Sequence, residues 1–340
     1  MRPGAAVPVL LAALAAACAS GPSENEIATR DQFLQRAVQY YGVARYPQAE
    51  QQALMGLAID DEDAQLHLIA GRAMLMQGTL DKVVQAEPHL QYAYDHLEER
   101  SHQAAYSLAE FHYRYASLLL QHLAREEELL DDTPDADADY LAQRRADIAE
   151  RRERAMEHLR RADALVDEAL TEAGDALYYL QLKGQVASLL GHDDEARAAL
   201  TQAIGILEES RRFKNRTLAT QTNLTVEQEE QLRRSLRSDI RREIALRGVL
   251  AALYKKAGDL EAEETEYTRM LQLDPDQPAV LYSRGMVRWE RGRRAEAADD
   301  LRMFLRRTDL PPEDERVRRA LDLIAEYERL IGAEGGPAAG

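Results

Sequence analysis

Small residues recur at a fixed spacing in this chain, and that spacing constrains the fold more than any other feature. The clearest example is residues 177–210, where positions 8, 15, 20, 24 and 27 hold Gly184, Gly191, Ala196, Leu200 and Ala203. Small residues at positions 8, 20 and 27 let two antiparallel helices approach closely, and a glycine near position 15 releases the chain from the first helix. The pattern predicts a pair of packed helices.

Further copies of this pattern occur on both sides of it. Residues 244–277 carry it at Ala251, Tyr254, Gly258, Leu260, Tyr267 and Pro275, and residues 278–311 follow without a gap with Gly285, Gly292 and Ala297. Looser copies occupy residues 30–63, with Ala37 and Ala49, and residues 64–97, with Gly71 and Gly78. The five copies resemble tetratricopeptide repeats (TPRs), which are 34-residue helix–turn–helix units. The resemblance covers roughly half of the chain and implies stacked hairpins that form a concave binding surface.

The rest of the chain is also helical but does not follow the repeat. Residues 98–174 read as two long helices around an acidic break at 131–139, and residues 312–331 as a final helix with a polar outer face. Thr225 and Gln228 have the spacing of a capping box, which opens a helix. We therefore expect an all-α protein: an α-solenoid of TPR-like helical hairpins with an inserted long helical hairpin and a C-terminal capping helix.

The expected domain boundaries follow these elements. They are a leader at 1–17, a flexible tether at 18–29, repeats 1 and 2 at 30–97, the long helical hairpin at 98–174, repeat 3 and a loop at 175–224, a helix with repeats 4 and 5 at 225–311, the capping helix at 312–331 and a disordered tail at 332–340. The loop is expected at Phe213 to Leu224, because this stretch is rich in Thr and Asn.

Residues 1–17 have the features of an export leader. A positive start is followed by an apolar run from residue 5 to 14, which is shorter than the ~20 residues that span a bilayer. Three alanines then precede Cys18, the only cysteine of the chain. This resembles a bacterial lipoprotein signal peptide, in which the cysteine is lipidated and the leader is cut just before it. Leu14 stands one position early, and Ala15 occupies the usual Leu position.

The lipoprotein resemblance implies a cellular location. Ala19 and Ser20 follow Cys18, where an Asp would favour the inner membrane in such lipoproteins. We therefore expect a lipid anchor at Cys18 in the outer membrane of a bacterial cell envelope, with the protein facing the periplasm. An ordinary secretory leader is the alternative, since Ala15 and Ala17 satisfy the small-x-small cleavage rule.

The composition argues against several classes of function. The chain has 60 acidic and 43 basic side chains and a formal net charge of −17, so its surface repels nucleic acid phosphates. No thiol follows Cys18, so no disulfide can form within the repeats. The sequence has no nucleophile elbow, phosphate loop or dinucleotide-binding glycine motif. We expect no enzyme activity, no cofactor and no nucleic acid partner.

The sequence also argues against a metal site. His89 and His96 are seven residues apart on one helix, or ~10 Å, which is too far for one zinc ion. Acids alternate at positions 135, 137 and 139 as in an EF-hand loop, but Tyr140 and Ala146 replace its glycine and glutamate. A solvated linker is the preferred interpretation of this break, with weak calcium binding as the alternative. We therefore expect no resident metal.

The TPR resemblance implies where a partner would bind. In that family, positions near 2, 5, 9, 12 and 13 of each first helix line the concave groove. In the last repeat these include Tyr282, Met286 and Trp289, and in the preceding repeat they include Lys255 and Lys256. Two lysines beside a Trp, a Met and a Tyr suit an extended or helical peptide with an acidic element.

A second interpretation of the same residues stays open. Tyr282, Met286 and Trp289 stand at i, i+4 and i+7, which is also the spacing of a core stripe. Arg284 and Arg288 occupy positions 7 and 11, where large apolar residues are usual, and they leave the rotation of this helix undecided.

The features together predict a noncatalytic adaptor in envelope assembly that is tethered at Cys18 and binds a protein or peptide partner. The alternative is a structural role in envelope maintenance through contact with peptidoglycan.

Overall fold

The protein is helical throughout the part that can be described. The computed structural model describes residues 23–98, 101–132, 137–173, 176–221 and 223–334. These residues form thirteen helices and no strand, so the predicted all-α class is confirmed. No helix within the described ranges is long and apolar enough to cross a membrane. The chain divides into two compact units, Met1–Gly174 and Asp175–Gly340.

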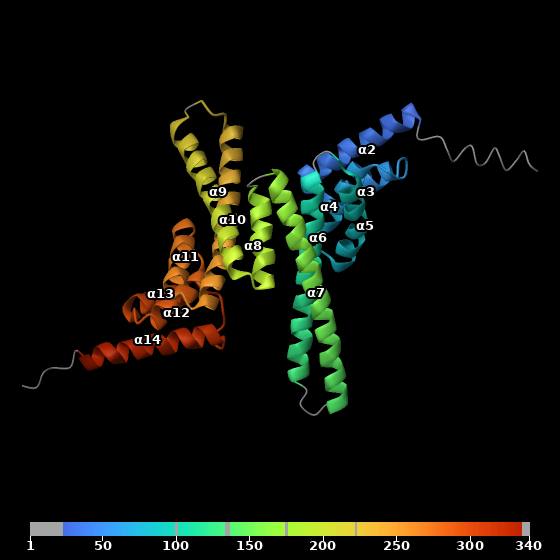
Figure 1. Cartoon of the computed structure of the whole chain (residues 1–340). Helices are drawn as coiled ribbons and strands as arrows, with labels where there is room; N and C mark the ends of the chain where they lie inside the picture. The colour runs from blue at the N-terminus through green and yellow to red at the C-terminus, as the bar shows by residue number, and fades with distance from the viewer. Residues whose placement is uncertain (1–22, 99–100, 133–136, 174–175, 222, 335–340) are drawn as a thin grey trace, which may run out of the picture. The chain divides into compact units, whose positions relative to one another are not determined.

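The first unit is a row of three helical hairpins (Figure 1). Its helices are α2 (Glu24–Gly42), α3 (Tyr46–Leu57), α4 (Ala64–Leu75), α5 (Leu80–His96), α6 (Ser101–Asp131) and α7 (Ala138–Ala173). Each helix packs against the next, and α4 also contacts α2 and α6. The first helices of the three hairpins, α2, α4 and α6, therefore lie in sequence along one side of the unit.

The core of the first unit lies between these hairpins. One cluster includes Leu75 and Val83 of the second hairpin with Leu108 and Phe111 of α6, and Leu165 of α7 packs against it. The last hairpin is much longer than a repeat, and the buried residues of α7 recur at helical spacing. They are Ile148, Ala155, Leu159, Ala162, Val166 and Ala169. This spacing forms an apolar stripe against α6, while ion pairs such as Arg152 with Glu127 cover its outer side.

The second unit is built in the same way and ends in a single helix. Its helices are α8 (Leu177–Leu190), α9 (Asp193–Thr220), α10 (Val226–Ala257), α11 (Leu260–Leu273), α12 (Pro278–Glu290), α13 (Arg294–Arg307) and α14 (Glu315–Glu334). Successive helices pack together, and α14 covers α13. Leu323 and Ile324 of α14 join the core cluster formed by α11, α12 and α13, so α14 caps the last repeat as predicted.

Close helix packing depends on the glycines that define the repeat. A Cβ at Gly184 of α8 would lie 2.6 Å from the Leu200 side chain and 3.4 Å from the Ala196 carbonyl oxygen of α9. Only glycine therefore lets α8 and α9 approach this closely. Gly191 ends α8 in the left-handed conformation, with φ of 80°, which frees the chain to turn into α9.

Three sequence-based boundaries differ from the structure, and each underestimated helix. The expected loop at Phe213–Leu224 is helical as far as Thr220, because α9 continues beside α10. The ion pair between Lys214 and Asp239 joins the two helices there, and the hydroxyl of Thr217 donates to the carbonyl of Phe213 instead of breaking the helix. Packing therefore overrides the weak helix propensity of this stretch.

The second error concerns the expected flexible tether at 18–29. Helix α2 begins at Glu24, because Ser23 and Glu26 form a capping box in which the Ser23 hydroxyl accepts from the Glu26 amide. Residues 18–22 lie outside the described part of the chain, as do Cys18 and the predicted leader. At the other end, α14 extends to Glu334, into the expected tail at 332–340.

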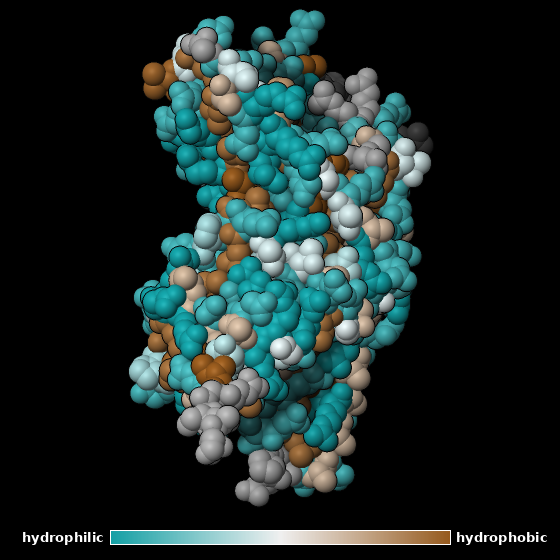
Figure 2. All heavy atoms as spheres, turned by 90° about the vertical axis from the view of Figure 1, so that its left-hand side faces the viewer, coloured by the Kyte–Doolittle hydropathy of each residue, from teal (hydrophilic) through white to brown (hydrophobic). Residues whose placement is uncertain are grey.

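The surface reflects the charged composition. On the face of the molecule drawn in Figure 2, hydrophilic residues predominate and hydrophobic residues are scattered among them. Scattered apolar residues are normal on a protein surface, so those that line a concave site together are the informative ones.

Candidate functional site

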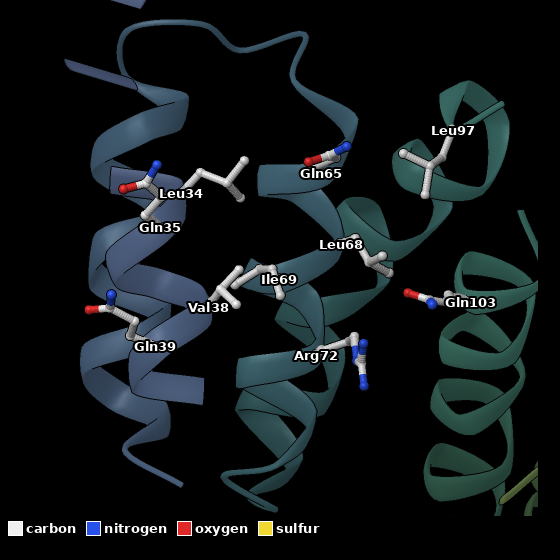
Figure 3. A pocket seen from close by; sticks show the side chains of 10 residues that line it. All are labelled: Leu34, Gln35, Val38, Gln39, Gln65, Leu68, Ile69, Arg72, Leu97 and Gln103. Carbon is white, nitrogen blue, oxygen red and sulfur yellow. The ribbon is translucent and has the colours of Figure 1, made fainter. Parts of the chain in front are cut away.

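The first unit contains a cleft where the first helices of its hairpins meet. The cleft has a volume of about 570 Å³, within the size range of ligand pockets in proteins. It is lined by Leu34, Gln35, Val38 and Gln39 of α2, by Gln65, Leu68, Ile69 and Arg72 of α4, by Leu97 at the end of α5 and by Gln103 near the start of α6. Figure 3 shows these ten side chains.

The floor of the cleft is apolar. Leu34 and Val38 point from α2 toward Ile69 of α4, while Leu68 points toward Leu97 on the other side of α4 (Figure 3). Leu68 is buried, but Val38 is 48% exposed. The spacing of Leu34 and Val38, one helical turn apart, keeps both side chains on the same face of α2. The cleft therefore presents apolar surface that no described part of the chain covers.

The remaining lining residues are four glutamines and one arginine. Each glutamine side chain carries both a donor and an acceptor, so it can bond to a peptide backbone in either direction. Among the described lining residues Arg72 alone is charged, and it is partly buried. Its guanidinium carbon lies 4.9 Å from the centre of the Tyr41 ring, which is a cation–π contact.

Arg72 affects the acidity of its neighbours. Burial raises the pKa of the Tyr41 hydroxyl, and the charge of Arg72 offsets part of this rise. Burial likewise raises the pKa of Tyr106, again opposed by Arg72. Glu110 acts on both tyrosines in the opposite sense, but its carboxylate is bonded to Arg114 at 2.7 Å. Within the described residues, no carboxylate lies within the 4.0 Å ion-pair distance of Arg72.

The residues predicted as a groove in the second unit are largely engaged in packing. Tyr282, Met286 and Trp289 are partly buried against the core of α11 to α14. The Tyr282 ring lies 5.2 Å from the Phe304 ring, and the Arg294 guanidinium lies 5.5 Å from the Trp289 ring. This is the placement that the core-stripe interpretation describes, while a binding role for their exposed edges stays a prediction.

The two predicted lysines stand at the end of α10. Lys256 is paired with Asp193 at 2.8 Å. Lys255 is exposed, and its charge acts on Glu263, although burial raises the pKa of that carboxyl overall. The role of both lysines in binding a partner also stays a prediction.

Arg284 and Arg288 are accommodated by ion pairs inside the last hairpin. Arg284 donates two hydrogen bonds to Asp300, at 2.9 and 2.7 Å, and Arg288 bonds to both Asp300 and Glu264 at 2.8 Å. Both carboxylates are buried. The helix therefore has the rotation that the repeat predicts, with charged pairs in place of the usual apolar contacts.

Sequence reasoning missed two histidine pairs because it compared histidines along single helices. Nδ1 of His89 lies 2.9 Å from Nδ1 of His67 on the neighbouring helix, and Nδ1 of His112 lies 2.8 Å from that of His158. Nε2 of His67 also bonds to the Asp61 carbonyl, which can only accept. His67 therefore carries its proton on Nε2, and His89 donates to it.

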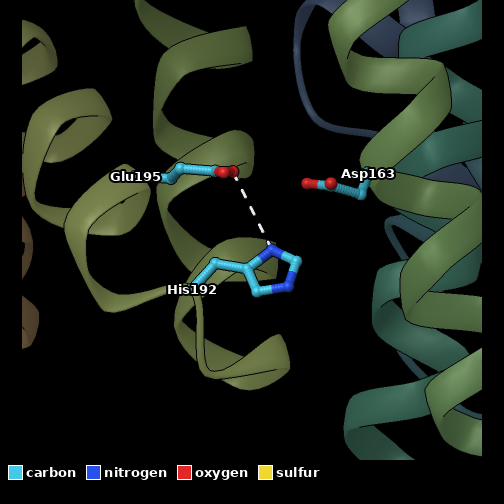
Figure 4. A group of neighbouring side chains, drawn as sticks. All are labelled: Asp163, His192 and Glu195. Carbon is cyan, nitrogen blue, oxygen red and sulfur yellow. Dashed lines mark ion pairs between the residues drawn. The ribbon is translucent and has the colours of Figure 1, made fainter.

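Other polar groups that the sequence singled out are helix starts. Asp137 caps α7 by accepting from the amides of Asp139 and Tyr140, at 2.8 and 3.2 Å. Position 135 lies outside the described residues. At the start of α9, His192 and Glu195 are 3.8 Å apart, as the dashed line in Figure 4 marks. Figure 4 also draws Asp163, which belongs to the first unit.

The position of a residue within its repeat is a sequence signal that could have identified the cleft. Leu34 and Val38 stand at positions 5 and 9 of the first repeat, and Leu68 and Arg72 stand at positions 5 and 9 of the second. These are the positions that Tyr282 and Met286 occupy in the last repeat. The rule was applied only to the last two repeats, and in the last one it pointed to a helix that α13 and α14 cover.

Comparison with known proteins reveals similarity at the level of structure. No known protein-family profile matches the sequence. No curated protein matches it either. Among solved structures, the chain is similar to a thermophilic TPR protein of Thermus thermophilus, with 19% identity over 76% of this chain and 98% of that one and a TM-score of 0.43.

Two further structures are also TPR proteins. One, from Parabacteroides merdae, has 13% identity over 87% of this chain and 99% of that one, with a TM-score of 0.31. The other is the TPR domain of P58(IPK), with 13% identity over 91% of this chain and 99% of that one and a TM-score of 0.24. The helical hairpins and their glycine contacts, described above, are the features that make this fold TPR-like.

Proposed function

We propose that this protein is a noncatalytic adaptor that binds an extended segment of a partner protein in the cleft between α2, α4 and α6. The observation that carries this proposal is the uncovered apolar floor at Leu34, Val38 and Ile69, bordered by glutamines. Exposed apolar surface in a concave site is typical of a binding site for another molecule. The lining residues that the structure describes include no carboxylate, histidine, serine or cysteine that could act as a nucleophile or general base, which supports binding rather than catalysis.

We further propose that a lipid at Cys18 holds this adaptor on the outer membrane, facing the periplasm, and that it serves envelope assembly. The apolar leader and the position of the single cysteine support this part of the proposal. Two acyl chains are needed for stable anchoring, as in the lipoproteins that the leader resembles.

A selection experiment tests the cleft. The full-length chain is used to select binders from a phage-displayed library of random peptides of about twelve residues, which span roughly 40 Å when extended. The selected peptides are then measured against Val38→Trp, which fills the cleft, and Val84→Trp on α5. The two valines are a matched pair, since they are 48% and 47% exposed, but Val84 does not line the cleft.

We expect Val38→Trp to weaken the selected peptides by about tenfold or more, because the indole occupies the space of a ligand side chain. Val84→Trp should leave their affinity within about twofold, as surface changes away from a site usually do. A library that yields no binder, or peptides that bind both variants equally well, would contradict the proposed cleft.

A further inference from the structure

The cleft contains one cation, Arg72, that contacts Tyr41 but pairs with no carboxylate of the described residues, and this defines the chemistry of its ligand more narrowly. We propose that the cleft selects peptide segments in which a carboxylate stands beside apolar side chains, and that Arg72 binds this carboxylate. This inference rests on the proposed function of the cleft and specifies the partner that it takes.

The first support is the pairing of the other arginines in the first unit. In the described residues of this unit, the partly buried arginines other than Arg72 each lie within ion-pair distance of a carboxylate. They are Arg30 with Asp60, Arg114 with Glu110, Arg144 with Glu126, and Arg151 with Glu126. A partly desolvated cation is costly to leave without a counter-charge. Arg72 therefore differs from the others, because no carboxylate in the described part of the chain forms an ion pair with it.

The second support is the sign of the charge around the cleft. The chain carries a net charge of −17, yet no acid among the described residues lines the cleft. Glu110, the acid whose charge reaches the Tyr41 and Tyr106 beside Arg72, is already bonded to Arg114. Within the described lining, an acidic ligand thus meets one positive group and no competing carboxylate. A basic ligand would meet the same positive group, Arg72, and would be repelled.

The third support is the geometry of the lining. Arg72 lies one helical turn beyond Leu68 on α4 and points toward the side where Gln103 of α6 lies (Figure 3). Its planar guanidinium can hold a carboxylate through two parallel hydrogen bonds. Ile69 stands three residues before Arg72 on α4, and the Arg72 guanidinium lies over the Tyr41 ring of α2, so the apolar and the anionic contacts are neighbours in the cleft. A bound segment would reach both.

The experiment combines changes in the protein with changes in the peptide. Peptides selected with the full-length chain are compared with versions in which each Asp or Glu is replaced by Asn or Gln. Both sets are measured against the wild type, Arg72→Gln, Arg72→Lys and Arg72→Glu. The matched control is Arg125→Glu, which makes the same charge change on an exposed arginine of α6, ~33 Å along that helix from Gln103.

We expect the selected peptides to share an Asp or Glu near apolar residues. Replacing that acid should weaken binding to the wild type by about ten- to a hundredfold, the range of a hydrogen bond to a charged group. The same replacement should have little effect on Arg72→Gln, because the partner of the acid is already gone. Arg72→Lys should retain part of the affinity, Arg72→Glu should lose the most, and Arg125→Glu should bind as the wild type does.

The outcomes separate the two proposals. If Val38→Trp blocks the selected peptides but their acids can be replaced without loss of affinity, the cleft is supported and the role of Arg72 is overturned. The same conclusion follows if these peptides bind Arg72→Gln as tightly as they bind the wild type. Peptides that Val38→Trp does not block would overturn the cleft itself. Since the decisive comparison changes the peptide, it holds even if a substitution at Arg72 lowers the stability of the fold.

Discussion

At the scale of single residues, this fold places charged and titratable side chains where repeats of this type usually have apolar ones. Arg247 is 1% exposed, at position 4 of its repeat, and it bonds to Glu243, Glu266 and Glu208 at 2.7, 2.7 and 2.5 Å. A buried charge is tolerated only when such partners compensate for lost hydration. The same condition explains why Arg284 and Arg288 can stand inside the packed helices, and why Arg72, which pairs with no described carboxylate, differs from them.

The buried histidine pair of α6 and α7 predicts a loss of stability in acid. Burial, with the nearby His158 and Arg161, lowers the pKa of His112 to about 3. In the unfolded chain a histidine side chain has a pKa near 6.5. Between pH 6.5 and pH 3 the unfolded state therefore binds more protons than the folded state does. The contribution to stability is complete above pH 6.5 and declines as the pH falls, by up to about 1.4 kcal/mol per pH unit.

Denaturant unfolding at about pH 7.5 and about pH 5 measures this effect, and His112→Leu should reduce the difference between them. The control is Phe111→Leu, a buried neighbour whose loss should lower stability by a similar amount at both pH values. An unchanged pH dependence in His112→Leu would contradict the assignment.

At the scale of helices and hairpins, the contact between helices decides more than the propensity of either. Helix α9 extends through a Thr- and Asn-rich stretch because α10 lies beside it, and Thr225 with Gln228 opens α10 with the predicted capping box. In the second repeat, Gly71 contacts Leu90, three residues further along than the equivalent contacts of Gly184 with Leu200 and Gly285 with Leu301. The second helix of that hairpin is thus shifted without loss of close packing.

Two glycines of the third repeat give opposite predictions for the same substitution. Gly184→Ala should destabilise the second unit by about 1–3 kcal/mol, because its Cβ would meet Leu200 at 2.6 Å. Gly205→Ala in α9 should instead stabilise it by roughly 0.5–1 kcal/mol, since no atom lies within 4 Å of the new Cβ and alanine favours helix.

Chemical denaturation, followed through hydrogen exchange of α8 and α9, would measure both effects. Equal effects of the two substitutions on stability would show that the close approach of α8 and α9 does not restrict position 184 to glycine.

At the scale of the whole molecule, the chain consists of two compact units of helical hairpins. The cleft with Arg72 belongs to the first unit, and the residues predicted from the last repeat belong to the second. The proposed anchor, Cys18, precedes the first unit in the chain and lies outside the described residues.

The proposed lipid anchor predicts how the intact protein is distributed between membrane and soluble fractions of a bacterial cell. Cys18→Ser should abolish labelling with a radioactive fatty acid and move the protein from the membrane fraction to the soluble periplasmic fraction, because the thiol is the site of acylation. Cys18→Ala should behave in the same way. Persistent membrane association in both variants would contradict a lipid anchor.

The sequence by itself determined the kind of fold, because the spacing of small residues such as Gly184 and Ala196 leaves few alternatives to close-packed hairpins. The turn glycines, the capping box of α10 and the capping role of α14 could also be predicted from the sequence, because they depend on local chemistry. Only the tertiary structure decided in which repeat these positions remain open. Leu34 and Val38 line a cleft, whereas Tyr282 and Met286, at the equivalent positions, pack against the core next to α13 and α14. Side chains in the same register differ in exposure because burial depends on the neighbouring helix, which the repeat pattern does not specify.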